Sequence, residues 1–139
     1  MPERWAGGFA RTMIDKDERI LTIVRKHGRY AAEAYAFVFE ALDYTLRKRG
    51  GARRHVSGPE IMDGVRGLAL DTFGFLARDV LKRWGVTSTE DFGEIVFHLI
   101  GDDLLQKTAD DKKEDFASLF EFSEAFDGAF EQTLASVEI

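Results

Sequence analysis

Apolar residues recur every three or four positions along most of the chain, a spacing that predicts a mainly helical protein. The strongest pattern covers residues 30–49, where several alanines add high helix propensity to a continuous apolar stripe. Because this stripe is wide, we expect the helix to lie at the centre of the core. Its members are Tyr30, Ala34, Phe37, Val38, Ala41, Leu42, Thr45 and Leu46.

The same spacing and local capping signals predict further helices, giving five to six in total. Ser57 is expected to be an N-cap because Pro59 follows in the first turn and Glu60 occupies the third position of a capping box. The other expected helices are residues 15–28, a helix between Gly74 and Gly85, residues 90–100 with a cap among Thr87, Ser88 and Thr89, and a last helix beginning at Ser123 with Phe126, Ala129, Phe130 and Leu134 facing inward.

Two short apolar segments near the C-terminus, residues 104–108 and 116–122, flank the polar stretch 109–115. A tip of that polarity must be solvated, so the pattern favours a small β-hairpin packed against helices. A helix followed by such a hairpin is the order found in winged-helix proteins. The predicted fold is therefore mainly α with a small β-hairpin and a winged-helix-like C-terminal half.

Glycines and a proline near the N-terminus oppose a regular element there. We therefore expect residues 1–14 to form a flexible arm and residues 15–139 to form one globular domain, a size that supports a real core. The N-terminus has no apolar stretch of signal-peptide type, and no apolar run reaches membrane-spanning length. The expectation is a cytoplasmic protein without a membrane partner.

Charge is distributed unevenly along the chain. Residues 1–56 carry 12 Lys/Arg and 7 Asp/Glu, a net charge of +5, whereas residues 85–139 carry 3 and 14, a net charge of −11. A phosphate backbone would be repelled by the second region, so nucleic-acid binding is not expected through the acidic C-terminal half. The outward side of the helix 90–100 is instead interpreted as a protein-contact surface formed by Glu90, Asp91, Glu94 and His98.

A second candidate site is the loop before the Ser57 cap. Arg53, Arg54 and His55 precede the first backbone N–H groups of a helix, which favour anions, and Gly58 would let a ligand approach the backbone. These residues predict an anion-binding site for a phosphate or carboxylate. They also suit an acidic protein surface, or simple capping by Ser57 with the arginines paired at the surface.

Catalytic, metal and cofactor chemistry receive little support. The chain has no cysteine, no glycine-rich phosphate loop and no nucleophile motif. Glu94 and His98 are one helical turn apart, but the second pair that a metal site of this kind needs is not evident. We therefore predict no catalytic residues, no metal and no cofactor.

Several strings of residues resemble a known family. Residues 54–58, 84–86 and 89–97 are similar to a family of conserved hypothetical proteins from planctomycete and verrucomicrobial bacteria, and the likeness extends over residues 15–127. That resemblance implies no established activity, cofactor or partner.

The leading hypothesis from the sequence is a non-catalytic domain that binds another protein. One alternative is a DNA-binding regulator that uses the basic N-terminal half. Another is an enzyme or sensor that binds a phosphorylated small molecule at the loop 53–58. The sequence identifies neither the partner protein nor the oligomeric state.

Overall fold

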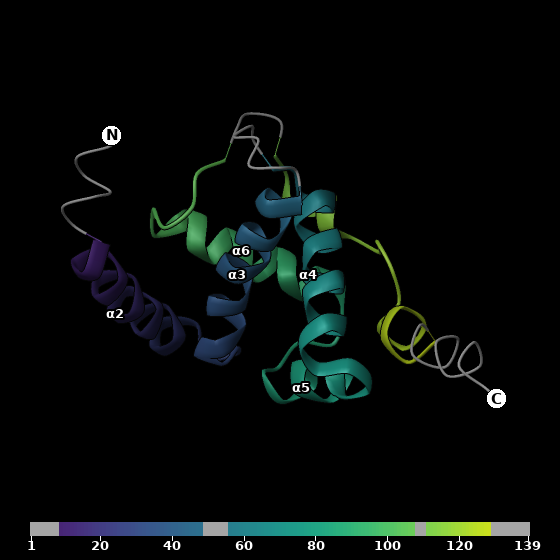
Figure 1. Ribbon diagram of the computed structural model, residues 1–139. Helices are drawn as coiled ribbons and strands as arrows, with labels where there is room; N and C mark the ends of the chain where they lie inside the picture. Colours follow the sequence, from purple (N-terminus) through teal and green to yellow (C-terminus); the bar gives the residue numbers. More distant parts are fainter. Residues whose placement is uncertain (1–8, 49–55, 108–110, 129–139) are drawn as a thin grey trace.

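The computed structural model describes residues 9–48, 56–107 and 111–128, with side chains from Lys16 onward (Figure 1). Within these ranges every regular element is helical and no residue forms a strand. The elements in chain order are α2 (Phe9–His27), α3 (Ala32–Lys48), α4 (Gly58–Phe73), the 3-10 helix η1 (Gly74–Leu76), α5 (Ala77–Arg83), α6 (Thr89–Gly101), the 3-10 helix η2 (Lys113–Phe116) and the π-helical turn η3 (Ser123–Gly128).

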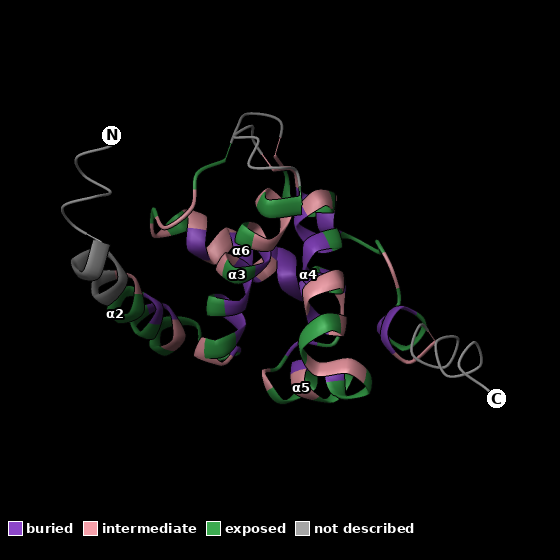
Figure 2. Cartoon of the chain, viewed as in Figure 1, coloured by how far each residue is buried: buried purple, intermediate pink, exposed green. Residues whose placement is uncertain are grey.

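The predicted central helix is confirmed as α3, which packs closely along α4. Ala34, Tyr35 and Val38 on α3 are fully buried. Gly64 allows the close approach, because a Cβ added there would lie 2.9 Å from the carbonyl oxygen of Ala41. Figure 2 shows the buried residues gathered where α3, α4 and α6 face one another.

Local signals set the helix ends as predicted. The Ser57 side chain accepts a hydrogen bond from the Glu60 backbone N–H at 3.3 Å, and Glu60 Oε1 accepts one from the Ser57 N–H at 3.0 Å, which completes the capping box. Ser88 caps α6. Gly74 and Gly85 adopt φ values of 56° and 90°, a backbone region that favours glycine.

The N-terminal helix is longer than the pattern indicated. α2 begins at Phe9, so it includes residues 9–14, which the sequence assigned to a flexible arm; residues 1–8 lie outside the described residues. α2 buries Ile20 and Ile23 and lies at one side of the molecule (Figure 1). None of the helices in the described ranges is both long and apolar enough to cross a membrane.

The predicted hairpin is wrong, because two backbone N–H groups of each expected strand donate hydrogen bonds to α6. The backbone N–H groups of Leu104 and Leu105 donate to the Leu99 carbonyl at 2.9 and 3.3 Å and so complete the C-terminus of α6. In the second segment, the N–H of Ser118 donates to Glu90 Oε2 and that of Leu119 to Thr89 Oγ1. Residues 113–116 form η2 instead, and the described residues contain no ladder for a sheet.

The winged-helix interpretation is also wrong. A reading helix must present an exposed face to its target, but α6 is central and contacts α2, α3, α4 and η2. More than half of its residues are buried, namely Thr89, Asp91, Phe92, Gly93, Ile95, Val96 and Leu99. α6 is therefore a core helix, and the strands that would flank it are absent from the described residues.

Candidate functional site

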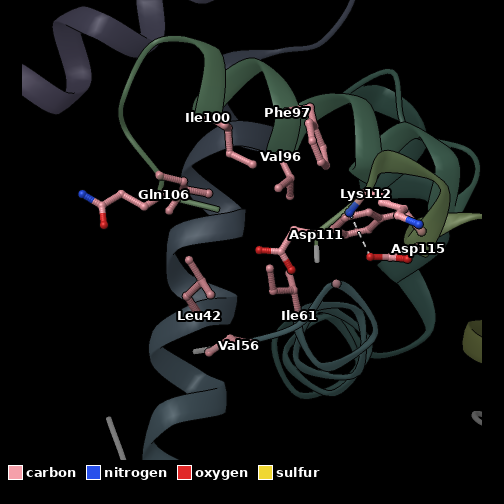
Figure 3. Close-up of a pocket in the computed structure, with 13 residues that line it drawn as sticks. Leu42, Val56, Ile61, Val96, Phe97, Ile100, Gln106, Asp111, Lys112 and Asp115 are labelled. Atoms are coloured by element: carbon pink, nitrogen blue, oxygen red, sulfur yellow. Dashed lines mark hydrogen bonds between the residues drawn. The ribbon is translucent and has the colours of Figure 1, made fainter. Parts of the chain in front are cut away.

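A pocket of about 130 Å³ lies between α3, α4, α6 and η2 (Figure 3). Its walls are mainly apolar and its rim is polar. Apolar lining residues are Leu42, Val56, Ile61, Val96, Phe97, Ile100, Leu105 and Phe116. Polar lining residues are Gln106, Asp111, Lys112 and Asp115. An apolar cavity with a few charged groups at its edge suits the capture of an apolar group.

Helical periodicity explains why three of the lining side chains share one wall. Val96 and Ile100 are four residues apart on α6, so they project from the same side, with Phe97 beside them. Leu42 of α3 and Ile61 of α4 face them across the cavity (Figure 3). The pocket therefore forms where three helices meet, and η2 closes one side.

Phe116 is the residue by which η2 packs against the helices. Its ring is buried and contacts two glycines on different helices. A Cβ added to Gly58 would lie 3.1 Å from the ring, and one added to Gly93 would lie 2.9 Å from the Phe116 Cβ. Both glycines thus provide the space that the Phe116 ring occupies, and this contact fixes one wall of the pocket.

Polar contacts hold η2 in its orientation at the rim. The Lys112 backbone N–H donates to Asp115 Oδ2 at 3.0 Å, as Figure 3 shows. Lys113 Nζ lies 2.9 Å from Glu94 Oε1, which joins η2 to α6. The exposed ion pair adds little stability by itself, but it places charged groups of both signs around the opening.

Only Ser57 and Gly58 of the predicted anion site lie among the described residues, so anion binding there stays a prediction. The Ser57 side chain is used in the capping box, and Gly58 is buried beneath the Phe116 ring. The space beside Gly58 at the start of α4 is therefore occupied by the Phe116 ring. Arg53, Arg54 and His55 lie outside the described residues.

The four predicted protein-contact residues on α6 do not share one exposed face. Glu90 is exposed and accepts hydrogen bonds from Ser118, and Glu94 is half-buried and paired with Lys113. Asp91 is buried, and His98 has a side chain only 16% exposed. Only the two glutamates among these four therefore remain available at the surface of α6.

Asp91 joins the start of α6 to the α2–α3 connection. Its Oδ1 accepts hydrogen bonds from Tyr30 Oη at 2.6 Å and Arg29 at 2.9 Å, and its Oδ2 accepts one from the Thr87 N–H at 2.9 Å. Burial alone would raise the pKa of Asp91, but the hydrogen bonds from Thr87 and Tyr30 and the charge of Arg29 together hold it below its usual value. This carboxylate is a structural group.

His98 occupies a second polar cluster at the other end of α6. Its Nδ1 is hydrogen-bonded to the Tyr35 hydroxyl at 2.9 Å, and its ring stacks on that of His27 with centroids 3.5 Å apart. Glu94 Oε2 is 3.9 Å from His98 Nε2. In the described part of the chain, no group of three or more His, Asp or Glu is arranged to hold a metal ion.

Sequence reasoning missed both the pocket and the histidine pair. Each combines residues that are far apart in the chain, such as Leu42 with Ile100 and His27 with His98. One signal was available, since Gly93 lies within the predicted helix beside Phe92 and near Ile95 and Val96, and a glycine inside a helix often has a packing reason. The identity of that group, Phe116, required the tertiary structure.

No family model, curated protein or solved structure matches this chain. The resemblance to the family of conserved hypothetical bacterial proteins therefore stays a prediction.

Proposed function

We propose that this protein is a non-catalytic protein-binding domain whose pocket between α3, α4, α6 and η2 receives one apolar side chain of a basic partner segment. The observation that carries the proposal is the pocket itself, an apolar cavity of about 130 Å³ with charged residues at its rim. Buried anchors in well-packed pockets supply much of the binding energy in protein interfaces.

The size of the pocket favours a single side chain over a larger ligand. A dry cavity of roughly 150 Å³ accommodates one benzene molecule, whereas pockets for drug-sized ligands and cofactors occupy about 300–1,000 Å³. At about 130 Å³ the cavity suits the side chain of a leucine, methionine or phenylalanine. The remainder of such a partner would lie across the rim.

Charge favours a basic partner around that anchor. Residues 85–139, which supply α6 and η2, carry a net charge of −11. Asp111 and Asp115 line the pocket with one residue of opposite charge, Lys112, and Glu114 beside them is exposed, so acidic groups outnumber basic ones. Complementary charge mainly accelerates association and selects among partners, while the buried apolar anchor supplies the affinity.

The test is a selection of random peptides displayed on phage against the full chain, with a filled-pocket variant as counter-selection. Ile100→Trp places a larger side chain in the pocket, because Ile100 is a half-buried residue of its wall. We expect enriched peptides to share one Leu, Met or Phe flanked by Lys or Arg. Their synthetic versions should bind the Ile100→Trp variant at least about tenfold more weakly, a loss of about 1.4 kcal/mol.

Leu119→Trp is the matched control, because Leu119 is 37% exposed and does not line the pocket. It should retain the affinity of the unmodified chain for the selected peptides. Circular dichroism would verify that both tryptophan variants remain helical. Selection of no common anchor, or equal binding by the unmodified chain and Ile100→Trp, would refute the proposal.

A further inference from the structure

Two histidines from distant parts of the chain meet where the C-terminus of α2 lies against α6. The rings of His27 and His98 have centroids 3.5 Å apart and an interplanar angle of 5°, so they lie face to face. We call this contact the histidine stack. His27 is exposed to solvent, whereas the His98 side chain is mostly covered. A proton can therefore reach one ring directly while the other is partly desolvated.

The other contacts that hold α2 against α6 are modest. The Arg19 guanidinium donates to the Asp102 carbonyl, and Lys26 Nζ lies 4.0 Å from Asp102 Oδ1. Both basic side chains are exposed, and polar contacts of this kind contribute little stability because water competes with them. Ile20 and Ile23 supply the buried apolar surface of α2. A repulsion within the histidine stack therefore acts against two weak polar contacts and the burial of these isoleucines, of which Ile23 lies in the C-terminal half of α2.

Charged and titratable groups from each neighbouring element surround the stack. They are Lys26 on α2, Arg29 and Tyr30 in the α2–α3 connection, Tyr35 on α3, Asp91, Glu94 and Asp102 on and beside α6, and Lys113 on η2. Glu94 could stabilise a charged His98, but it is already paired with Lys113 at 2.9 Å and is farther from His98 Nε2, at 3.9 Å. Asp91 is fully engaged by Arg29, Tyr30 and Thr87.

We propose that the histidine stack is an acid-sensitive contact, and that protonation of both rings releases the C-terminal turn of α2 from α6. Two imidazolium ions stacked at this distance repel each other, and Glu94 and Asp102, which also face Lys113 and Lys26, offset only part of that repulsion. Neutral rings, in contrast, gain from stacking. The docked arrangement is therefore favoured at neutral pH and disfavoured in acid.

The direction of the pH effect follows from the surroundings of His98. Burial, followed by the charge of His27, lowers the pKa of His98 below its ordinary value, although Glu94 partly opposes this. When α2 is released, His98 gains solvent and its pKa returns toward about 6.5. The released form thus binds more protons, and docking weakens as pH falls below about 6.5.

The experiment measures the position of α2 relative to the rest of the full chain. Because the sequence has no cysteine, spin labels can be placed at Thr22→Cys on α2 and Thr72→Cys on α4, both exposed positions. Double electron–electron resonance would give the distance distribution at pH 7.5 and pH 5. We expect a second, broader population at pH 5, with the ratio of released to docked molecules rising by about tenfold for each unit of pKa difference.

Two variants and one additional label pair distinguish local release from general acid effects. His27→Gln removes the repulsion between the rings but leaves His98 partly buried, so it should show a smaller released population at pH 5 than the unmodified chain. Arg25→Gln, which removes an exposed charge on α2 outside the stack, should respond like the unmodified chain. A label pair at Thr72→Cys and Gln106→Cys should keep its distance at both pH values. The proposal is overturned by an unchanged α2 distance at pH 5, by an equal response in His27→Gln, or by simultaneous broadening of the second label pair.

Discussion

Helix α6 makes two contacts that depend on different physical properties. Near its N-terminus, Gly93 packs against the buried Phe116 of η2, and this contact is apolar and fitted in shape. Near its C-terminus, His98 stacks on His27 of α2 and is hydrogen-bonded to Tyr35. The first contact is sensitive to added or removed volume and contains no titrating group. The second is sensitive to proton concentration.

Because of this difference, the two ends of α6 are expected to respond to different perturbations, one to mutation and the other to acid. A protein interior is packed to crystal-like density, so a change of one methyl group at Gly93 must displace a neighbour. The histidine stack is partly exposed on the His27 side, so it can adjust to a change in shape but not to a second charge. Mutations should therefore perturb the Phe116 contact most, and acid should perturb the histidine stack most.

The largest effect is expected from Phe116→Ala. Removing a buried phenylalanine leaves a cavity, and such changes lower the free energy of unfolding by about 3–5 kcal/mol. Urea denaturation would measure the loss, which should be the same at pH 7.5 and pH 5.5. Phe120→Ala is the control: Phe120 is only half-buried, so its loss should be smaller. A strong pH dependence of the Phe116→Ala loss would contradict the separation of the two contacts.

A smaller effect is expected from Gly93→Ala. The new Cβ would lie 2.9 Å from the Phe116 Cβ, and overpacking of this kind costs about 1–3 kcal/mol. The higher helix propensity of alanine offsets about 1 kcal/mol of this cost. The net loss in the free energy of unfolding should therefore not exceed about 2 kcal/mol. In Gly101→Ala, by contrast, the added Cβ meets nothing within 4 Å, so that variant should be neutral or slightly stabilised. Equal thermal midpoints for the two variants would show that Phe116 does not fill this space.

The smallest effect is expected from pH. Because burial and His27 lower the pKa of His98, the unfolded chain binds more protons, and the free energy of unfolding should fall as pH decreases through about 6.5. Urea titrations at pH 7.5 and 5.5 should show a loss smaller than either packing variant produces. His98→Gln should reduce this pH slope, while Arg25→Gln, which removes an exposed charge on α2, should leave it unchanged. An unchanged slope in His98→Gln would assign the effect to other groups.

Local reasoning predicted the helices between residues 15 and 101 well but failed in residues 102–122. Of the last predicted helix, the described residues contain only η3, and Ala129, Phe130 and Leu134 lie outside them. Leu104, Leu105 and Phe116 have the apolar character of strand residues, and the polar stretch between them resembles a hairpin tip. In the structure, the first two complete the C-terminus of α6, and Phe116 fills the space beside Gly58 and Gly93. The alternation of apolar residues cannot distinguish a strand from a segment that covers a helix.

The candidate sites show the same limit. Anion binding at the loop 53–58 stays a prediction. The sequence predicted the capping role of Ser57, which the structure confirms, but not the packing of Gly58 against Phe116. It placed Asp91 on an outward face, whereas three groups from other segments draw this carboxylate inward. The packing of Gly58 and the burial of Asp91 both depend on residues more than 20 positions away in the chain. Asp91 also accepts a hydrogen bond from the backbone of Thr87 in the adjacent turn.

The sequence by itself determined most of the helical segments between residues 15 and 101, the caps at Ser57 and Ser88, and the opposite charges of the two halves, because these depend on residues within a few positions of one another. Ser57 with Glu60, Ser88, Gly74 and Gly85 all act through their own local backbone. Tertiary structure alone decided that α6 is central, that a pocket opens between three helices and η2, and that His27 meets His98. Those outcomes depend on which apolar surfaces pack against each other and which groups form hydrogen bonds. These pairings are decided only when segments far apart in the chain come together.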